Sequence, residues 1–211
     1  MIGCLGRFEK VPFDVFKWDI APCPEVQCLC EDDAQFSKRM RGVYDTLKLP
    51  MRATDGSAGY DFYSPFDFCI QPGESVIIPT GVRVVIPESA VLFCVPRSGS
   101  GFKYGIKLAN SVGIIDADFY NPETGSEGHI LLRLMNHDHN EPVSFSAGDG
   151  FAQGIIVPYA TMPEYDNEQW EIRGVKKRAG GFGSTDGADP EIFEQDDIVK
   201  KKHRFGFKRK K

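Results

Sequence analysis

The chain has 211 residues and a mass of 23.5 kDa, enough for one sizeable hydrophobic core with appendages. Its 41% hydrophobic and 26% charged residues exclude a wholly disordered chain, and its 22 glycines and 14 prolines argue against a helical bundle. The net charge of −5 is unevenly distributed along the chain, because eight of the 25 Lys and Arg residues lie between positions 200 and 211. Residues 1–199 therefore hold 17 basic and 30 acidic residues, so the body is acidic and the tail is basic.

We expect a cytoplasmic protein. No apolar run approaches the roughly 20 residues needed to span a bilayer, and the start MIGCLGRFEK lacks the hydrophobic stretch of a signal peptide. Six cysteines in such a protein are expected to be free thiols. Four of them fall within the first 30 residues, but their spacing matches no common zinc module and no histidine lies near.

The first 48 residues predict a helical extension. Apolar residues recur at helical spacing along one stripe, namely Phe36, Met40, Val43, Tyr44 and Leu47. Asp32 or Asp33 can serve as the N-cap of this helix, and Pro50 follows it as a stop. A shorter and weaker helical pattern covers residues 14–18.

Residues 49–177 predict a β domain. Prolines recur from Pro50 onward at spacings that suit strands and turns but no long helix. The segments SVIIPTGVRVVIP, AVLFCVP, HILLRLMN and FAQGIIVP are rich in β-branched and aromatic residues and are bounded by turn residues. The expected fold is all-β, a barrel or sandwich of many short strands.

The composition changes again beyond residue 177. Residues 178–187 include GGFGST, which has too many small residues to form a packed element and by itself favours a flexible linker. Residues 188–211 are acidic and then basic, ending in KKKHRFGFKRKK, and we expect this tail to be disordered.

Three segments of the β domain could carry chemistry. PRSGSGFKYG follows a predicted strand, where Ser and Gly before a helical turn can present N–H groups and a hydroxyl to anionic oxygens, although an ordinary turn fits the same letters. Asp116 and Asp118 stand at i and i+2 after an apolar strand, so they would share one face as metal ligands or a base, or form a solvated hairpin edge. Asp61, in SAGYDFYS, indicates little alone.

Five segments taken together are far more specific. SAGYDF (57–62), PRSGS (96–100), NSVGIIDADF (110–119), GDGFAQGIIVP (148–158) and RAGGFGST (178–185) stand in the order and approximate spacing of the five motifs of the homotrimeric dUTPases. The chain strongly resembles that family over about residues 50–187. Its hairpin turn with SEGHI and its N-terminal segment ending in KLP are most similar to the bacterial and phage branch.

The resemblance implies a distorted jelly-roll or β-barrel fold of the β-clip type and a homotrimer whose subunits build each active site together. It implies hydrolysis of dUTP to dUMP and pyrophosphate. Asp116 is then the general base for a water that attacks the α-phosphorus, and Arg97 supports the carboxylates and phosphates. Mg²⁺ is the implied cofactor, held on the triphosphate through water by Asp61.

The resemblance also places the substrate contacts. The implied phosphate contacts are Ser98, Gly99 and Gln153, and the implied uracil contacts are Asn110 and the backbone of Ile114, Ile115 and Leu131. Phe119 stands where the family usually has tyrosine, and its ring would pack beneath the deoxyribose and exclude a 2′-hydroxyl.

The resemblance turns the Gly-rich segment from a linker into an active-site lid. Phe182 maps to the ring that stacks over uracil, Gly183 to the freely folding arm, and Ser184 and Thr185 to the γ-phosphate. Arg178 is favoured as the phosphate cation because of its guanidinium fork, but many members place the arginine one residue earlier, where Lys177 stands.

Two other functions compete with this interpretation. The dCTP deaminases share the fold, but their catalytic glutamate lies in a pattern like GHITLEL, where this chain has GHILLRL and Arg133. A phage-type regulatory or nucleic-acid-binding protein is the second alternative, because Phe205 and Phe207 lie between the charges of the basic tail. A solvated tail is favoured over such binding.

Overall fold

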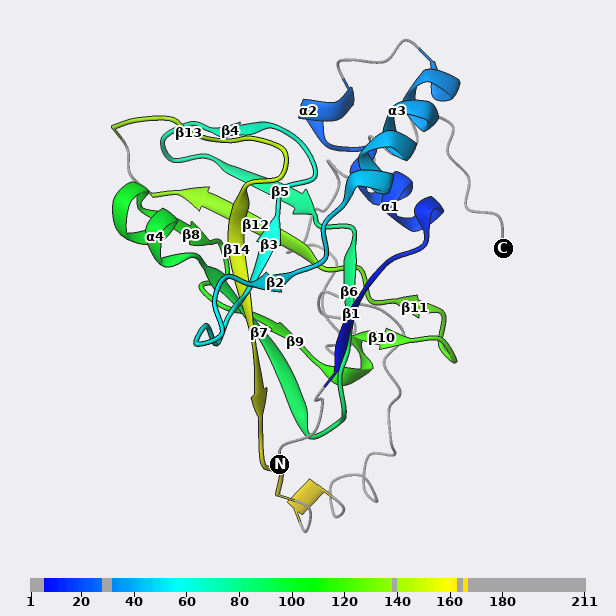
Figure 1. Cartoon of the computed structure of the whole chain (residues 1–211), viewed down its shortest axis with the longest axis vertical. Coiled ribbons are helices and arrows are strands. Elements are labelled where there is room, and N and C mark those ends of the chain that lie inside the picture. Colours follow the sequence, from blue (N-terminus) through cyan, green and yellow to red (C-terminus); the bar gives the residue numbers. More distant parts are fainter. Residues whose placement is uncertain (1–5, 28–31, 138–139, 163–164, 167–211) are drawn as a thin grey trace.

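The computed structural model describes residues 6–27, 32–137, 140–162 and 165–166, and these form mostly short strands (Figure 1). The elements are β1 Arg7–Lys10, α1 Phe13–Ile20, α2 Pro24–Gln27, α3 Asp33–Thr46, β2 Met51–Arg52, β3 Tyr60–Tyr63, β4 Phe68–Ile70, β5 Ser75–Pro79, β6 Val82–Val85, β7 Ala90–Pro96, α4 Ser98–Tyr104, β8 Ile106–Leu108, β9 Gly113–Ile115, the 3₁₀ turn η1 Ala117–Phe119, β10 Tyr120–Asn121, β11 Ser126–Glu127, β12 Leu131–Asn136, β13 Val143–Phe145 and β14 Gly150–Pro158. The predominance of strands among these elements confirms the prediction of an all-β, distorted jelly-roll body.

Two antiparallel sheets form most of the body. One has five strands in the order β2-β3-β14-β7-β9, and the other has three in the order β5-β12-β8. Alternation along β12 turns Leu132 and Leu134 into the core while Arg133 is exposed, which is the pattern of a sheet with one packed face. Fully buried residues of both sheets, such as Ile78, Leu92 and Leu134, belong to one core.

The long predicted helix is present as α3. The side chain of Asp32 accepts a hydrogen bond from the backbone N–H of Gln35 at 2.8 Å, which makes Asp32 the N-cap. Phe36 and Met40 are buried, as the apolar stripe predicted. The weaker pattern around residues 14–18 is the helix α1, and Figure 1 shows α1, α2 and α3 grouped at one end of the sheets.

The N-terminal segment also contains a strand that the sequence pattern did not indicate. β1 pairs antiparallel with β6 along four residues, from Arg7 opposite Val85 to Lys10 opposite Val82. Its sequence RFEK carries three charges in four residues, so hydrophobic alternation gave no signal. Only the pairing partner, about 75 positions along the chain, reveals it as a strand.

The N-terminal helices share the core of the sheets. Phe16 and Ile20 of α1 are fully buried. Gly81, with φ of 74°, lies so close to these elements that a side chain there would collide with Leu47 and crowd Phe16. His129 joins the two parts, because its Nδ1 lies 2.8 Å from Asp19 Oδ2 while its Nε2 accepts a hydrogen bond from the Gly81 backbone at 2.8 Å.

No helix among the described residues is long and apolar enough to cross a membrane. The predicted arm (178–187) and tail (188–211) lie outside the described residues.

Candidate active site

Three of the predicted site residues lie together where β3, β14 and β7 run side by side. Gln153 of β14 is opposite Asp61 of β3 on one side and Val95 of β7 on the other. Arg97 directly follows β7, and its Nη2 lies 3.1 Å from Asp61 Oδ2. We call Asp61, Arg97 and Gln153 the arginine cluster.

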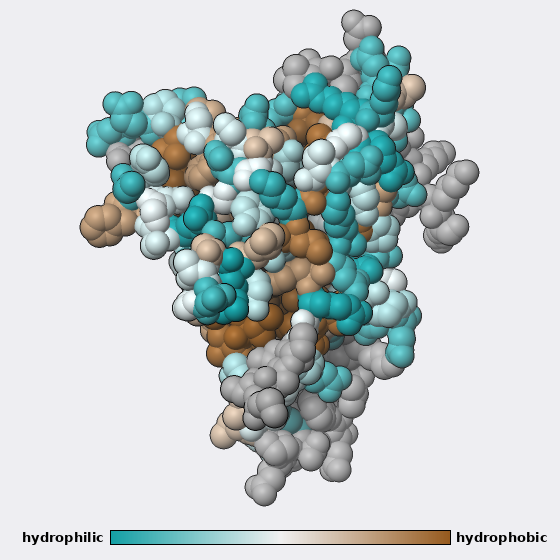
Figure 2. Space-filling view, in the orientation of Figure 1, coloured by the Kyte–Doolittle hydropathy of each residue, from teal (hydrophilic) through white to brown (hydrophobic). Residues whose placement is uncertain are grey.

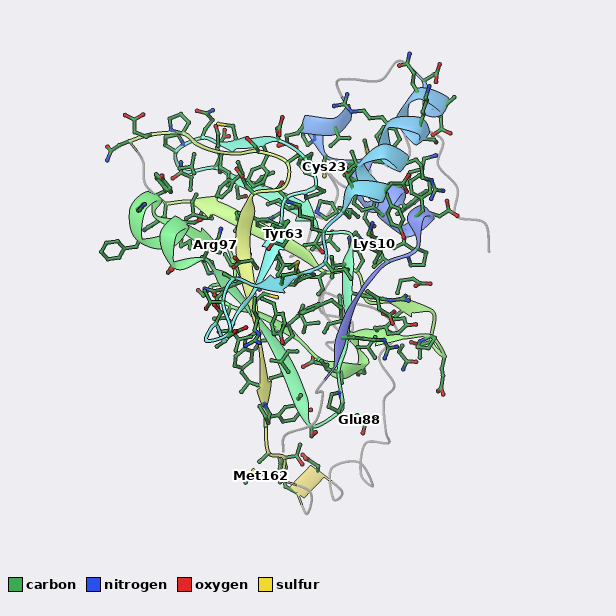
Figure 3. All side chains as sticks on the ribbon, in the orientation of Figure 1. Lys10, Cys23, Tyr63, Glu88, Arg97 and Met162 are labelled. Carbon is green, nitrogen blue, oxygen red and sulfur yellow. The ribbon has the colours of Figure 1, made fainter. Side chains whose placement is uncertain are left out.

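Backbone carbonyls fix two of these side chains. Arg97 Nη1 donates to the carbonyl of Gly150 at 2.9 Å, and Gln153 Nε2 donates to the carbonyl of Pro96 at 3.1 Å. Gly150 pairs with Tyr63 across β3 and β14, and Figure 3 labels Tyr63 and Arg97. The cluster therefore keeps its geometry through main-chain contacts as well as through the ion pair.

Two glycines make room for the cluster, and the sequence analysis assigned neither of them a role. A side chain at Gly150 would collide with the Arg97 guanidinium, and one at Gly59 would collide with the Gln153 carboxamide. Both glycines lie inside the quoted motifs GDGFAQGIIVP and SAGYDF, so the motif letters were the available signal. Close backbone approach explains why these positions carry no Cβ.

The segment after Arg97 is the short helix α4, with Ser98 and Gly99 exposed in its first turn. It ends at Gly105, whose left-handed φ of 63° lets its N–H bond back to Gly101. Ser98 and Gly99 therefore lie at the surface, adjacent in sequence to the Arg97 guanidinium.

The prediction that Asp116 and Asp118 share one face of a strand is wrong. β9 ends at Ile115, and Asp116 is the N-cap of the 3₁₀ turn Ala117–Phe119. Asp116 is half-buried and Asp118 is exposed. The two-residue period applies only to extended backbone, so it fails where the chain turns.

We call residues 116–119 the aspartate segment. The backbone N–H of Phe119 donates to the Asp116 carbonyl at 3.2 Å, which closes the turn. The hydroxyl of Ser126 donates to the Phe119 carbonyl, so the following hairpin β10-β11 holds the end of the segment. Phe119 is half-buried and packs against the core.

The predicted uracil-contact residues lie around β9. Asn110 is exposed in the turn before β9, where Ser111 has φ of 65°, a left-handed conformation that is uncommon outside glycine. Ile114 is exposed while Ile115 is buried, as strand alternation requires. Leu131 is half-buried, and its neighbour Leu132 approaches Gly113.

The strands on either side of Asn110 do not pair with each other. β8 pairs with β12, whereas β9 pairs with β7, so the turn carries the chain from one sheet to the other. A hairpin needs mutual pairing of its two strands, so β8 and β9 do not form one.

The aspartate segment and the arginine cluster of one chain are far apart. β9 pairs with β7 so that Ile115 is opposite Leu92, which brings Asp116 level with Val91. Arg97 directly follows the end of β7, six residues beyond Val91. At about 3.3 Å per residue, β7 separates the two groups by about 20 Å.

The outer face of the five-stranded sheet is apolar beside the arginine cluster. Ile155, Phe93 and Ile114 stand in register across β14, β7 and β9, and Ile114 is 61% exposed. Val95 lies next along β7, opposite Gln153. Figure 2 shows hydrophobic surface over the region where Figure 1 places β7, β9 and β14.

Two buried thiols are unsuited to nucleophilic chemistry. Burial raises the pKa of Cys94 to about 12, and burial together with the nearby Glu25 and Asp19 raises the pKa of Cys23 to about 12. Cys23, Cys69 and Cys94 are free thiols, as expected. Cys4, Cys28 and Cys30 lie outside the described residues.

Comparison with known proteins places this site in a family. A family model described as dUTPase matches residues 45–186. The chain is 36% identical over 139 residues to the deoxyuridine 5'-triphosphate nucleotidohydrolase of Lactococcus lactis, which covers 66% of this chain and 88% of that protein. The protein of that name from Haemophilus influenzae is 38% identical over 146 residues, covering 68% and 90%. The chain belongs to the dUTPase family.

A solved structure is also similar to this chain. The dUTPase of Streptococcus mutans is 37% identical and covers 54% of this chain and 88% of that one, with a TM-score of 0.48. The dUTPase match starts at residue 45, so β1, α1, α2 and all but the last two residues of α3 precede it. The family resemblance drawn from the five motifs is confirmed.

Part of the predicted dUTPase site cannot be placed. Arg178, Phe182, Gly183, Ser184, Thr185 and the alternative Lys177 lie outside the described residues. Their roles stay predictions.

Proposed function

We propose that this protein hydrolyses dUTP to dUMP and pyrophosphate in active sites shared between copies of the chain. The observation that carries the proposal is the separation along β7, which keeps the predicted base Asp116 about 20 Å from the arginine cluster of its own chain. A nucleotide's α-phosphorus cannot meet both groups of one chain. A neighbouring copy must therefore supply one of them.

The apolar outer face supports the same assembly. Phe93, Ile114 and Ile155 lie on the face of the sheet that also carries Asp61 and Gln153. Burial of such a face against another copy would be favourable by roughly 25 cal/mol per Å² of apolar surface removed from water. It would also bring a second chain directly to the arginine cluster. A closed homotrimer is the assembly that we propose.

The arginine cluster suits a chain of phosphates. The planar Arg97 guanidinium can donate in parallel to two phosphate oxygens, and it is half-buried beside Asp61 rather than fully solvated. The Ser98 hydroxyl, the Gly99 backbone and the Gln153 carboxamide would add neutral donors. Neutral and cationic donors together would hold the triphosphate while its charge redistributes during the reaction.

Asp116 would act as the general base. Its carboxylate would take a proton from water as the water oxygen bonds to the α-phosphorus. The bond from that phosphorus to the bridging oxygen then breaks, and pyrophosphate leaves with the bonding electron pair. The N-cap position in a short turn projects Asp116 beyond the end of β9, where a substrate bound between chains could reach it.

Selection of a deoxyuridine would come from the turn and strand before Asp116. Backbone donors and acceptors of Ile114, Ile115 and Leu131, with Asn110, would pair with the uracil edge. The Phe119 ring would close the space that a 2′-hydroxyl requires. Both surfaces belong to the chain that supplies Asp116, so the base and the specificity elements would arrive together.

Mg²⁺ fits this site only as a solvated ion. No group of three or more potential ligands occurs among the described residues, but Asp61 provides one largely buried carboxylate beside the phosphate-binding donors. Mg²⁺ usually keeps several waters and takes one or two carboxylates plus substrate phosphates. Asp61 would hold such an ion through water, and the ion would neutralise phosphate charge. The arm residues would complete the proposed site as a lid.

A mixing experiment tests the shared site. Asp116→Asn and Arg97→Ala are each expected to be inactive on dUTP alone. When the two are unfolded together and refolded as mixed assemblies, sites that combine the intact Asp116 of one chain with the intact Arg97 of another should restore up to about a quarter of wild-type turnover. A mixture as inactive as its components would contradict the shared site.

Product analysis tests the substrate. Formation of dUMP and pyrophosphate is expected from dUTP, with slower turnover of UTP and dTTP. Ammonia release from dCTP would instead favour the deaminase, although Arg133 stands exposed on β12 where that family carries its glutamate.

A further inference from the structure

Arg83 joins three segments that are distant in sequence. From β6 its Nε donates to Glu9 Oε2 at 3.0 Å, its Nη2 lies 2.9 Å from the same oxygen, and its Nη1 donates to Glu127 Oε2 at 2.9 Å. The guanidinium also lies over the Tyr120 ring, 4.0 Å from its centroid. One side chain thus connects β1, β6 and the hairpin β10-β11, which Figure 1 shows next to one another.

These contacts are formed in partial shelter from water. The Arg83 side chain is only 15% exposed. Hydrogen bonds from Arg7, which has the larger effect, and from Arg83 lower the pKa of Glu9. This carboxylate is therefore ionised near neutral pH. Charge-assisted bonds and a cation over an aromatic face are directional, so together they fix the position of the hairpin more strictly than apolar packing would.

Tyr120 is held from two sides. Arg83 covers its ring, and the backbone of Gly128 lies so near that a side chain there would overlap the Cα and Cβ of Tyr120. Tyr120 also pairs with Glu127, the residue that Arg83 binds. Phe119 comes immediately before Tyr120, and Asp116 is linked to Phe119 through the 3₁₀ turn.

We propose that Arg83 is a positioning residue for the aspartate segment. By clamping Tyr120 and Glu127 it fixes the end of the turn that begins at Asp116, and so sets the orientation of the base and of the Phe119 ring. Glu9 extends the clamp to β1, which precedes the family match, so the N-terminal strand contributes to the geometry of the active site. The catalytic part of this inference rests on the proposed function.

The main test compares Arg83→Met with a matched control, Arg41→Met. Arg41 covers the Phe13 ring at 3.5 Å within the N-terminal segment, so its loss removes a similar cation–π contact from a different place. Arg83→Met should lower kcat for dUTP by about tenfold or more with KM changed less than threefold, because displaced catalytic groups cost rate more than binding. The preference for dUTP over UTP should fall as well. Arg41→Met should leave all three quantities near wild type.

A second readout needs no substrate. Hydrogen exchange followed by mass spectrometry should show faster amide exchange within residues 116–128 in Arg83→Met and unchanged exchange there in Arg41→Met. Unchanged exchange in Arg83→Met would overturn the clamp whether or not the protein acts on dUTP. Faster exchange with wild-type kcat and wild-type substrate preference in an active enzyme would overturn its role in positioning the base. A wild type inactive on dUTP would contradict the proposed function alone, and the clamp would then be decided by exchange.

Two milder variants cover the case in which Arg83→Met does not fold. Glu127→Gln leaves the Arg83–Glu9 pair intact and should lower kcat by a smaller factor at constant KM, with faster exchange in residues 116–128. Arg83→Lys keeps the charge but loses the fork, and should recover only part of the activity. Wild-type kcat and exchange in both variants would overturn the inference.

Discussion

The arginine cluster and the aspartate segment are stabilised in different ways. The cluster is built inside one sheet, where strand register and main-chain carbonyls locate Arg97 and Gln153. The aspartate segment leaves the sheet after Ile115 and relies on a one-turn 3₁₀ helix and on side-chain contacts to a separate hairpin. The half proposed to bind phosphate is therefore preorganised by backbone pairing, whereas the half with the proposed base depends on remote side chains.

The largest predicted effect comes from the proposed base, Asp116. Asp116→Asn keeps the size of the side chain but removes its capacity to take a proton at neutral pH. Because a general base typically contributes a factor of about 10² to 10⁴, kcat for dUTP should fall by at least about a hundredfold. Steady-state pyrophosphate release would measure it. A variant that keeps a tenth of wild-type kcat would remove Asp116 from this role.

Gly150→Ala probes the cluster with a single methyl group. The new Cβ would displace the Arg97 guanidinium from Asp61 and the Gly150 carbonyl, so kcat/KM should fall about tenfold or more. The obstructed atoms are the end of a flexible side chain, so the free energy of unfolding should change by less than about 1 kcal/mol.

Two other glycines serve as controls for that variant. Gly42→Ala, where a Cβ meets nothing within 4 Å, should stabilise helix α3 by up to about 1 kcal/mol and leave activity unchanged. Gly154→Ala would push a methyl group against Leu92 and Phe62 in the core and should cost about 1–3 kcal/mol. Urea unfolding and dUTP turnover separate the three cases. Equal activity of the alanine variants at 150 and 42 would contradict the close-approach argument.

An effect confined to alkaline pH concerns the strand that spaces the two regions. The thiol pKa of Cys94 on β7 is raised above its usual value near 9, so the folded state holds the proton more tightly than the unfolded chain. The stability that the folded state gains from this protonated thiol is fully present below the pKa of the thiol in the unfolded chain. It is lost as pH rises from about 9 toward 12. The free energy of unfolding should fall over that range more steeply in wild type than in Cys94→Ala.

Thiol labelling provides an independent check at pH 8. Exposed Cys69 should react rapidly, while Cys94 and Cys23 react only on unfolding. Rapid labelling of Cys94 in the native protein would contradict the burial that raises its pKa.

The sequence was sufficient for the long helix and for the order of the motifs, but not for the local turn at Asp116. The stripe from Phe36 to Leu47 predicted α3, with Asp32 or Asp33 as its cap, and the structure has Asp32 there. The motif order identified the segments that bring Asp61, Arg97 and Gln153 together. Pairing between distant segments could not be predicted from the sequence. The charged strand β1, the separate partners of β8 and β9, and the contacts of Arg83 all depend on residues dozens of positions away.

The length of β7 gives the proposed enzyme a dependence on its own concentration. A single chain would carry parts of several reaction centres but no complete one. At protein concentrations below the dissociation constant of the assembly, turnover per chain should then be lost although the chains remain folded. Nucleotide clearance would then begin only above a threshold concentration of the protomer.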